Sequence, residues 1–550
     1  MMMLATSLPA TLMPAATALC WQDHAVIIAY LAGMLLLGTA LSRRQQTDEE
    51  YFLGGRLMPW LAVGVSVIAS LLSSLTYLSE PGEVWNSGIT HMFGKMLAIP
   101  FEMCFVFLVC LPFMMRFRYT SAYEYLGDRF GWGTRTLGVV LFMMMVVLWM
   151  GFVVLASSRA LAAVSGMPLW TVIGTVGVVA TIYTMLGGLR AVIWTDVVQV
   201  ILLVGGGLFT IGYVAWTTGT GPTEWLAAAT THMHTGGTTH STPLFSLDPT
   251  VRATVMTVAL NMFIWHVCTH TANQMTVQRY FSTSSVAAAK RSFVTGSLLG
   301  VGLNLMLMTV GLALVYFYFG QGVPLDNNLN ATVRQERDLI FPTFAVHRLP
   351  PGVGGGILAA LLAAAMSSID SGINSMATVL SIEWRHRRHI GQTLRGQSRS
   401  GNHVTEARWM TAIFGAFITV AAFGLDFLPQ SLGIVDAMPR TFNAVTGPLG
   451  GLFFVGMFLP RAGGLAASTG ALLGMATSIG LGYCSELSGL LQQWGILSEA
   501  WPAISFTWVM PSALVVTIGS AAILSLVAPV RERVAAELTW RGKEGSRIEA

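Results

Sequence analysis

Apolar runs of about 20 residues recur from end to end of this 550-residue chain, and short polar or charged clusters separate them. A helix needs about 20 apolar residues to cross the hydrocarbon core of a bilayer. The pattern therefore predicts an all-α polytopic membrane protein with about thirteen transmembrane helices. We place them near residues 23–41, 58–86, 90–115, 135–164, 168–187, 191–217, 252–279, 292–320, 353–383, 405–426, 432–459, 464–483 and 504–529.

Polar residues interrupt two of these spans at membrane depth. The second span continues as SSLTYLSEPGEVW (73–85), and the seventh contains HVCTHTAN (266–273). Irregular backbone is tolerated at that depth only where it lines a cavity or is packed within protein. Two interrupted helices five spans apart are typical of a transporter built from inverted repeats. The repeats would be spans 2–6 and spans 7–11.

Loop charge sets the predicted topology. Arg and Lys gather in alternate loops, and the long loop 218–250 on the other side has neither. We therefore expect the N-terminus outside and the C-terminus in the cytoplasm. The expected organisation is an outer N-terminal tail (1–22), a first peripheral helix and inside loop (23–57), repeat one (58–217), an outer loop (218–251), repeat two (252–460), two peripheral helices (461–530) and a cytoplasmic tail (531–550).

Composition narrows the class of protein. The chain is 54% hydrophobic and 10% charged, whereas soluble domains carry about a quarter charged residues. The net charge of +4 calls for no nucleic-acid partner, and no obligatory protein partner is evident. Residues 1–20 lack Lys and Arg, so we expect no signal peptide, which fits a bacterial inner membrane.

The ninth span carries a stripe of oxygen-bearing side chains in AAAMSSIDSGINSMA (363–377). Hard oxygen donors suit a small hard cation, so this stripe points to ion coupling. Alternatively, the serines bond only the preceding turn of their own helix. Helical spacing places Ala364, Ser367, Ser368 and Ser371 on one face, with Asp370 and Asn374 as a second polar pair beside it.

Five segments, in this order, resemble the sodium/solute symporter family over roughly residues 25–460. They are YFLGGRLMPWLAVGVS (51–66), GGLRAVIWTDVVQ (187–199), NQMTVQRYF (273–281), AAAMSSIDSGINSMA (363–377) and GPLGGLFFVGMF (447–458). The resemblance implies a LeuT-like core of two inverted five-helix repeats. It also implies alternating access driven by the sodium gradient.

The family's sodium site can be carried over position by position. The resemblance implies that the carbonyl oxygens of Ala69, Leu72 and Ala364 bind Na⁺ together with the hydroxyls of Ser367 and Ser368. It also associates the aspartate of WTDVVQ, Asp196, with a second sodium in some members.

Other roles remain open for the two acids in these helices. The alternative role for Asp196 is a helix-start or gate residue that pairs with a nearby cation. Asp370 is a further candidate for the second ion, or else a structural acid satisfied by Asn374 or by a neighbouring helix.

The solute site is predicted in less detail. Lys95 lies about a turn into the third span and needs a partner at that depth. It would be a counter-charge for a carboxylate on the solute, or pair with Glu102, or extend outward to the membrane surface. His266 and His270 would bind solute oxygens or relay protons, and without a third ligand a transition-metal site is not expected. The candidate solute-binding residues are Ser73, Thr76, Lys95, His266, Thr269, His270 and Asn273.

These observations predict a secondary active transporter that takes up a small polar organic solute, with Lys95 pointing to one that bears a carboxylate. Its cofactor is Na⁺, and its partners are the solute, sodium ions and the lipid bilayer. A sugar-type solute is the first alternative, although the aromatic, amide and acid of sugar-transporting members are missing. A transport-deficient sensor of the same fold is the second, but only a short segment follows the last span. An enzyme is not expected, because no nucleophile or metal set is recognisable.

Overall fold

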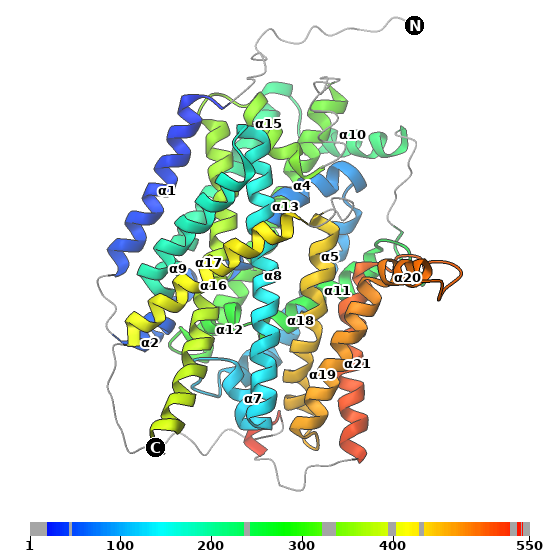
Figure 1. Ribbon diagram of the computed structural model, residues 1–550. Helices are drawn as coiled ribbons and strands as arrows, with labels where there is room; N and C mark the ends of the chain where they lie inside the picture. Colours follow the sequence, from blue (N-terminus) through cyan, green and yellow to red (C-terminus); the bar gives the residue numbers. More distant parts are fainter. Residues whose placement is uncertain are drawn as a thin grey trace, which may run out of the picture.

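A computed structural model of the chain describes residues 19–42, 47–235, 243–321, 337–393, 403–427, 434–527, 536–540 and 542. All regular secondary structure within these ranges is helical. Ten helices of the described ranges are long and apolar enough to cross a membrane, and they run side by side through the molecule (Figure 1). The all-α membrane architecture predicted from the apolar runs is therefore confirmed.

One of these ten helices contains two crossings. Helix α9 (Leu169–Thr218) has 50 residues, which at 1.5 Å per residue is about twice the thickness of the hydrocarbon core. Gly188 breaks it near the middle, with φ 53° and ψ −165°, values that suit glycine because it has no Cβ. The two halves match the predicted spans 168–187 and 191–217.

Both predicted interruptions are present. Helix α3 (Trp60–Leu71) is separated from α4 (Ser74–Ser87) by Leu72 and Ser73, whose ψ values are 85° and 174°. Helix α11 (Val255–Ala272) is separated from α12 (Gln274–Phe281) by Asn273, with ψ 113°. The Asn273 side chain accepts a hydrogen bond from the Met275 amide and so caps α12. Counting each interrupted pair as one crossing, and α9 as two, brings the total to about the thirteen expected from hydropathy.

The remaining helices complete the bundle. They are α1 (Trp21–Ser42), α2 (Asp48–Leu53), α5 (Thr90–Phe105), α6 (Leu111–Met114), α7 (Tyr123–Phe130), α8 (Trp132–Ser165), α10 (Pro222–Thr235), α13 (Val286–Val315), α15 (Ile340–Arg348), α16 (Val353–Thr393), α17 (His403–Asp426), α18 (Ile434–Phe458), α19 (Gly464–Gly482), α20 (Cys484–Gln493) and α21 (Phe506–Val527).

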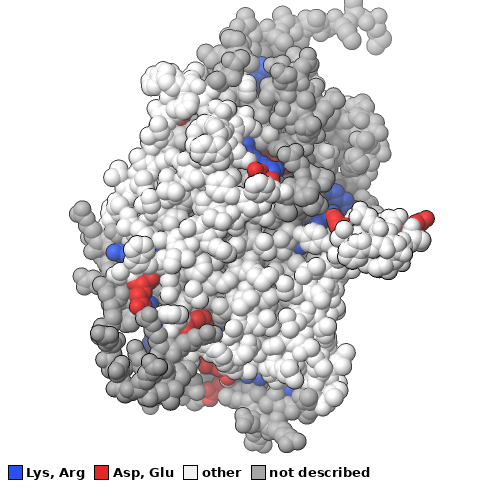
Figure 2. Space-filling model, in the orientation of Figure 1, with Lys and Arg blue, Asp and Glu red and all other residues white. Residues whose placement is uncertain are grey.

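Helix α16 forms the centre of the bundle, since every residue from 357 to 379 is buried. By contrast, the outer helices expose large apolar side chains such as Leu36, Ile201, Val420 and Ile523. The face of the molecule in Figure 2 has few charged side chains over most of its height. An apolar outer surface around a buried polar helix is the arrangement that a lipid environment requires.

Helices α3 and α13 approach each other closely through glycines. A Cβ on Gly64 would lie 2.6 Å from the Ser292 carbonyl oxygen, and one on Gly296 would lie 2.9 Å from the Gly64 carbonyl oxygen. Small residues allow the backbones of membrane helices to pack tightly in this way. The contact fixes α3 against α13 about two helical turns before the interruption at Leu72.

Candidate functional site: an ion cavity and a solute cavity at the interrupted helices

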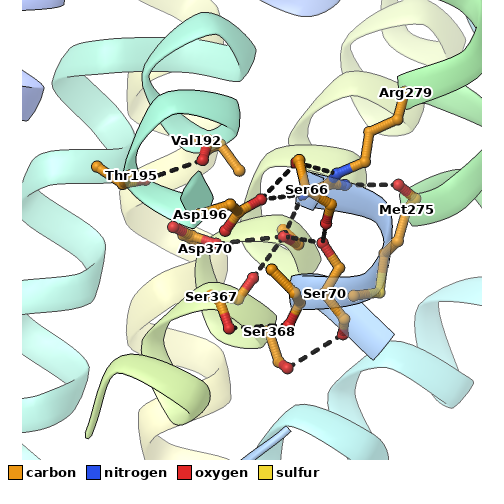
Figure 3. Close-up of polar contacts among 12 residues, drawn as sticks. Ser66, Ser70, Val192, Thr195, Asp196, Met275, Arg279, Ser367, Ser368 and Asp370 are labelled. Atoms are coloured by element: carbon orange, nitrogen blue, oxygen red, sulfur yellow. Dashed lines mark hydrogen bonds and ion pairs between the residues drawn. The ribbon is translucent and has the colours of Figure 1, made fainter. Parts of the chain in front are cut away.

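The end of α3 meets the serine stripe of α16. The Ser367 hydroxyl donates to the Ala69 carbonyl oxygen at 2.9 Å, and the Ser368 hydroxyl donates to the Ser70 carbonyl oxygen at 3.1 Å (Figure 3). Both hydroxyls also lie within 3.5 Å of the Ala364 carbonyl oxygen in their own helix. The serines therefore bond the preceding turn and also reach across to α3.

A small cavity lies between these two segments. Its volume is about 10 Å³, close to the space that one water molecule or one small ion requires. Of the five predicted sodium ligands, Ser368 alone is absent from its wall. The wall consists of Ala69, Leu72, Ala364 and Ser367, together with Gln199, Val200, Leu203 and Leu303.

Asp196, on α9, lies in a buried polar cluster next to this cavity. Its Oδ2 accepts hydrogen bonds from the Ser66 hydroxyl at 2.5 Å and from Arg279 Nη2 at 3.1 Å. Arg279 also donates from Nε to Ser66 and from Nη1 to the Met275 carbonyl oxygen (Figure 3). The Asp196 Oδ1 atom is buried without a hydrogen-bond partner. Asp196 therefore forms an ion pair with Arg279, the kind of contact described by the alternative in which it pairs with a nearby cation.

Asp370 joins the same cluster from α16. Its Oδ2 accepts from the Tyr183 hydroxyl at 2.8 Å and its Oδ1 from the Ser371 hydroxyl at 3.2 Å. Of the two partners considered for a structural acid, Asn374 and a neighbouring helix, the hydrogen bond comes from the neighbouring helix, through Tyr183 of α9. Ser371 accepts from Arg279 Nη2 at 2.5 Å and so links the surroundings of the two aspartates.

A second, larger cavity lies beside the interruption of α3 and α4. It has a volume of about 250 Å³, near the lower limit for pockets that bind small organic molecules. Two candidate solute residues, Thr269 and Asn273, are buried elsewhere. The candidates that do line it are Ser73, Thr76, Lys95, His266 and His270.

The partner of Lys95 differs from the one expected. Lys95 forms an ion pair with Glu80 of α4, not with Glu102. The turn between α4 and α5 brings Glu80 back against the first turns of α5, and His91 bonds the second Glu80 oxygen at 3.1 Å. Glu102 instead lies with its Oε2 3.4 Å from His266 Nε2. The predicted Lys95–Glu102 arrangement is therefore wrong.

Several cavity residues were not singled out from the sequence. Glu80 was visible as an acid in the interrupted span, but its contact depends on the turn at Gly88. The others lie on helices whose apolar patterns give no signal beyond membrane insertion. These residues are Trp149 of α8, Asn261 and Trp265 of α11, and Phe442 and Asn443 of α18.

The sequence that forms these helices and cavities matches a known protein family. Residues 51–478 match the model of the sodium:solute symporter family, a stretch that includes both interrupted helices and the serine stripe. The chain belongs to this family. Its members and relatives are transporters rather than enzymes, and the protein is an integral multi-pass membrane protein.

Similar family members support the same assignment. The chain is 31% identical to the sodium/sialic acid symporter SiaT of Proteus mirabilis over 474 residues, which cover 85% of this chain and 90% of the relative. It is 32% identical to the sodium-coupled monocarboxylate transporter 1 of Mus musculus over 476 residues, covering 83% and 73%.

A solved structure supports the fold. The substrate-bound, outward-open state of a Na⁺-coupled sialic acid symporter superimposes with a TM-score of 0.76 and 28% identity, covering 93% of this chain and 99% of that one. The LeuT-like fold, sodium-coupled solute symport and Na⁺ as the coupling ion are thereby confirmed.

Proposed function

We propose that this symporter takes up a small polar organic solute by alternating access and binds its coupling Na⁺ between α3 and α16. The observation that carries the ion site is the cavity of about 10 Å³ whose wall includes four of the five predicted ligands. The solute would occupy the cavity of about 250 Å³ on the other side of the interrupted segment.

The chemistry of the small cavity suits Na⁺. A helix that ends leaves its last carbonyl oxygens without helical partners, and the interruption at Leu72 does this at membrane depth. A serine hydroxyl retains acceptor lone pairs while its proton points elsewhere, so Ser367 and Ser368 add two more oxygens. Five neutral oxygens would replace water around the ion without placing a fixed charge in the site.

A second cation is proposed for the cluster around Asp196 and Asp370. The two carboxylates are fully buried and face a single guanidinium, that of Arg279. With both acids ionised the cluster carries one excess negative charge, and a buried charge requires a counter-charge. The unpartnered Asp196 Oδ1 is the ligand that this second cation would use.

The solute is proposed to bear a carboxylate that reaches Lys95. The ammonium group has three donors, so its pairing with Glu80 leaves N–H groups for a solute in the cavity. Two relatives, the sialic acid symporter and the monocarboxylate transporter, are named for carboxylate-bearing solutes. We also propose a bacterial inner-membrane location. The alternating loop charges support an N-terminus on the outside.

Sodium-dependent stability tests the ion site without knowledge of the solute. Thermal unfolding of the purified protein would be compared in NaCl and KCl at equal ionic strength. An ion that binds only the folded state stabilises it by RT ln(1 + [L]/Kd), about 2.7 kcal/mol at 100 times Kd. We expect this gain for wild type, and a much smaller one for Ser367→Ala and Ser368→Ala.

Ser520→Ala is the matched control. Ser520 lies on α21, and its hydroxyl bonds only carbonyl oxygens of its own helix. This variant should keep the full response to Na⁺. Equal stability of wild type in Na⁺ and K⁺, or an unchanged Na⁺ response in both site variants, would contradict the assignment.

A further inference from the structure

The carboxyl groups that line the larger cavity outnumber its lysine and arginine side chains. Two acids, Glu80 and Glu102, and one lysine, Lys95, line it. The Glu80 and Lys95 charges cancel in their ion pair, and His91 bonds the remaining Glu80 oxygen. Glu102 is left over. With Glu102 ionised, the carboxylate proposed for the solute would add a second negative charge, and the described lining residues include no second lysine or arginine to balance it.

Glu102 is buried, with only 3% of its surface exposed, and its Oε2 atom has no hydrogen-bond partner. The nearest basic atom is His266 Nε2, 3.4 Å away. An ionised carboxylate removed from water is costly unless it is paired and hydrogen-bonded. The Glu102 side chain therefore offers the solute a strong site for a positively charged donor.

Other polar atoms in the cavity wall are also acceptors. The Oδ1 atoms of Asn261 and Asn443 are buried without hydrogen-bond partners among the described residues. Buried polar atoms are nearly always bonded to protein, water or ligand. A solute with several N–H donors would satisfy this set, whereas a pure carboxylate has none to give.

Aromatic rings continue the wall from His266. The Trp265 ring lies 4.8 Å from the His266 ring, Trp149 lies 6.3 Å from Trp265, and Phe442 stacks on Trp149 at 5.4 Å. All of these rings line the cavity. Aromatic faces attract ammonium groups, most strongly when water is excluded. Carboxylate, acceptors and rings thus form one continuous surface suited to a cation.

We propose that the solute carries an ammonium group, which Glu102 pairs with beside the Trp149 and Trp265 rings. This inference rests on the proposed function, because the solute's carboxylate is the group assigned to Lys95. Together the two assignments describe a small zwitterion with an amine and a carboxylate, of a size that fits about 250 Å³. Glu102 would then determine which solutes of this size are accepted.

Binding to the purified full-length protein tests the proposal. Thermal stability in NaCl would be measured with rising concentrations of L-alanine, L-proline and glycine betaine as zwitterions, choline as a cation, and lactate and pyruvate as anions. We expect a zwitterion to stabilise wild type. Loss of one partner from a buried charge pair should weaken that binding about 30-fold or more in Glu102→Gln.

Two further variants keep the test decisive. Glu102→Asp retains the charge, so it should bind the same zwitterion better than Glu102→Gln does, and it covers the case in which the Gln variant fails to fold. Glu224→Gln, which removes a carboxylate from the outer helix α10, should bind like wild type.

The outcomes separate cleanly. If only anions stabilise wild type, if no ammonium-bearing compound does, or if Glu102→Gln binds a zwitterion as tightly as wild type, the ammonium assignment is overturned. In that case the buried Glu102 carboxyl is protonated and needs no counter-charge. Because Na⁺ stabilisation is measured without any solute, failure of the ion site would be recognised independently.

Discussion

Arg279 connects the two interrupted helices of the core, and its replacement should lower the free energy of unfolding by a large, measurable amount. It lies on α12 with only 1% of its surface exposed. Its donors reach Ser66 on α3, Asp196 on α9 and Ser371 on α16. One buried guanidinium therefore connects four helices around the proposed second-ion site.

The size of the effect follows from the burial of both charges. Arg279→Met leaves Asp196, which is fully buried, without its cation. Asp196→Leu leaves the guanidinium without its anion. Breaking a buried ion pair from one side destabilises a protein by about 3–5 kcal/mol, whereas replacing both partners by apolar groups is often nearly neutral. The double variant Arg279→Met/Asp196→Leu should therefore cost at least about 3 kcal/mol less than the sum of the two single variants.

The assay is unfolding of the purified protein in mixed micelles of increasing SDS content. It is carried out in KCl so that binding of Na⁺ does not contribute. Glu49→Gln serves as the control, because the Glu49 side chain is 60% exposed in its pair with Arg56. An exposed ion pair contributes about 0–1 kcal/mol, so this variant should unfold close to wild type.

Additive effects of the two substitutions on the free energy of unfolding would contradict this prediction. If the two single effects sum to the double effect within about 0.5 kcal/mol, then Arg279 and Asp196 are not energetically coupled. Single effects below about 1 kcal/mol would show that the charges are hydrated and not buried as the structure has them.

Two further variants test the packing and the polar cluster, both by the same unfolding assay. Gly64→Ala should destabilise the protein by about 1–3 kcal/mol, because its Cβ would meet the Ser292 carbonyl oxygen at 2.6 Å. Gly302→Ala is the control, because Gly302 lies on α13 and a Cβ there would have nothing within 4 Å. Equal effects of the two substitutions would argue against the close α3–α13 contact. Tyr183→Phe removes the hydroxyl that donates to Asp370 and should cost about 1–3 kcal/mol. No loss in Tyr183→Phe would mean that the Asp370 carboxylate has another donor.

The helix interruptions could be predicted from the sequence because they follow from composition alone. Polar residues in an apolar run are tolerated only where the protein encloses them, so serines after Leu72 and histidines before Asn273 marked the core. The helix boundaries were less predictable. His266 and His270 lie within the continuous helix α11, and the backbone leaves the helix only at Asn273.

The Lys95 contact could not be predicted, for a physical reason. Helical periodicity relates residues within one helix, and it placed Glu102 near the face of Lys95. The actual partner, Glu80, lies on the preceding helix, and its approach depends on the angle of the turn at Gly88, where φ is 70°. Trp149 and Asn443 were missed for a related reason, because only tertiary packing brings α8 and α18 to the cavity.

The position of Leu72 offers a physical route for coupling between the proposed ion site and the proposed solute site. Leu72 lines both the small cavity and the large one, and Ser73 follows it in the wall of the large one. An ion bound to the carbonyl oxygens of this segment would fix its irregular backbone, and with it the residues that meet the solute. The free-energy coupling is reciprocal, so the factor by which Na⁺ tightens solute binding must equal the factor by which the solute tightens Na⁺ binding. Substitutions that make the backbone at Leu72 and Ser73 more flexible should therefore weaken the affinities for Na⁺ and for the solute together. By contrast, Glu102→Gln should weaken solute binding and leave unchanged the affinity for Na⁺ measured without solute.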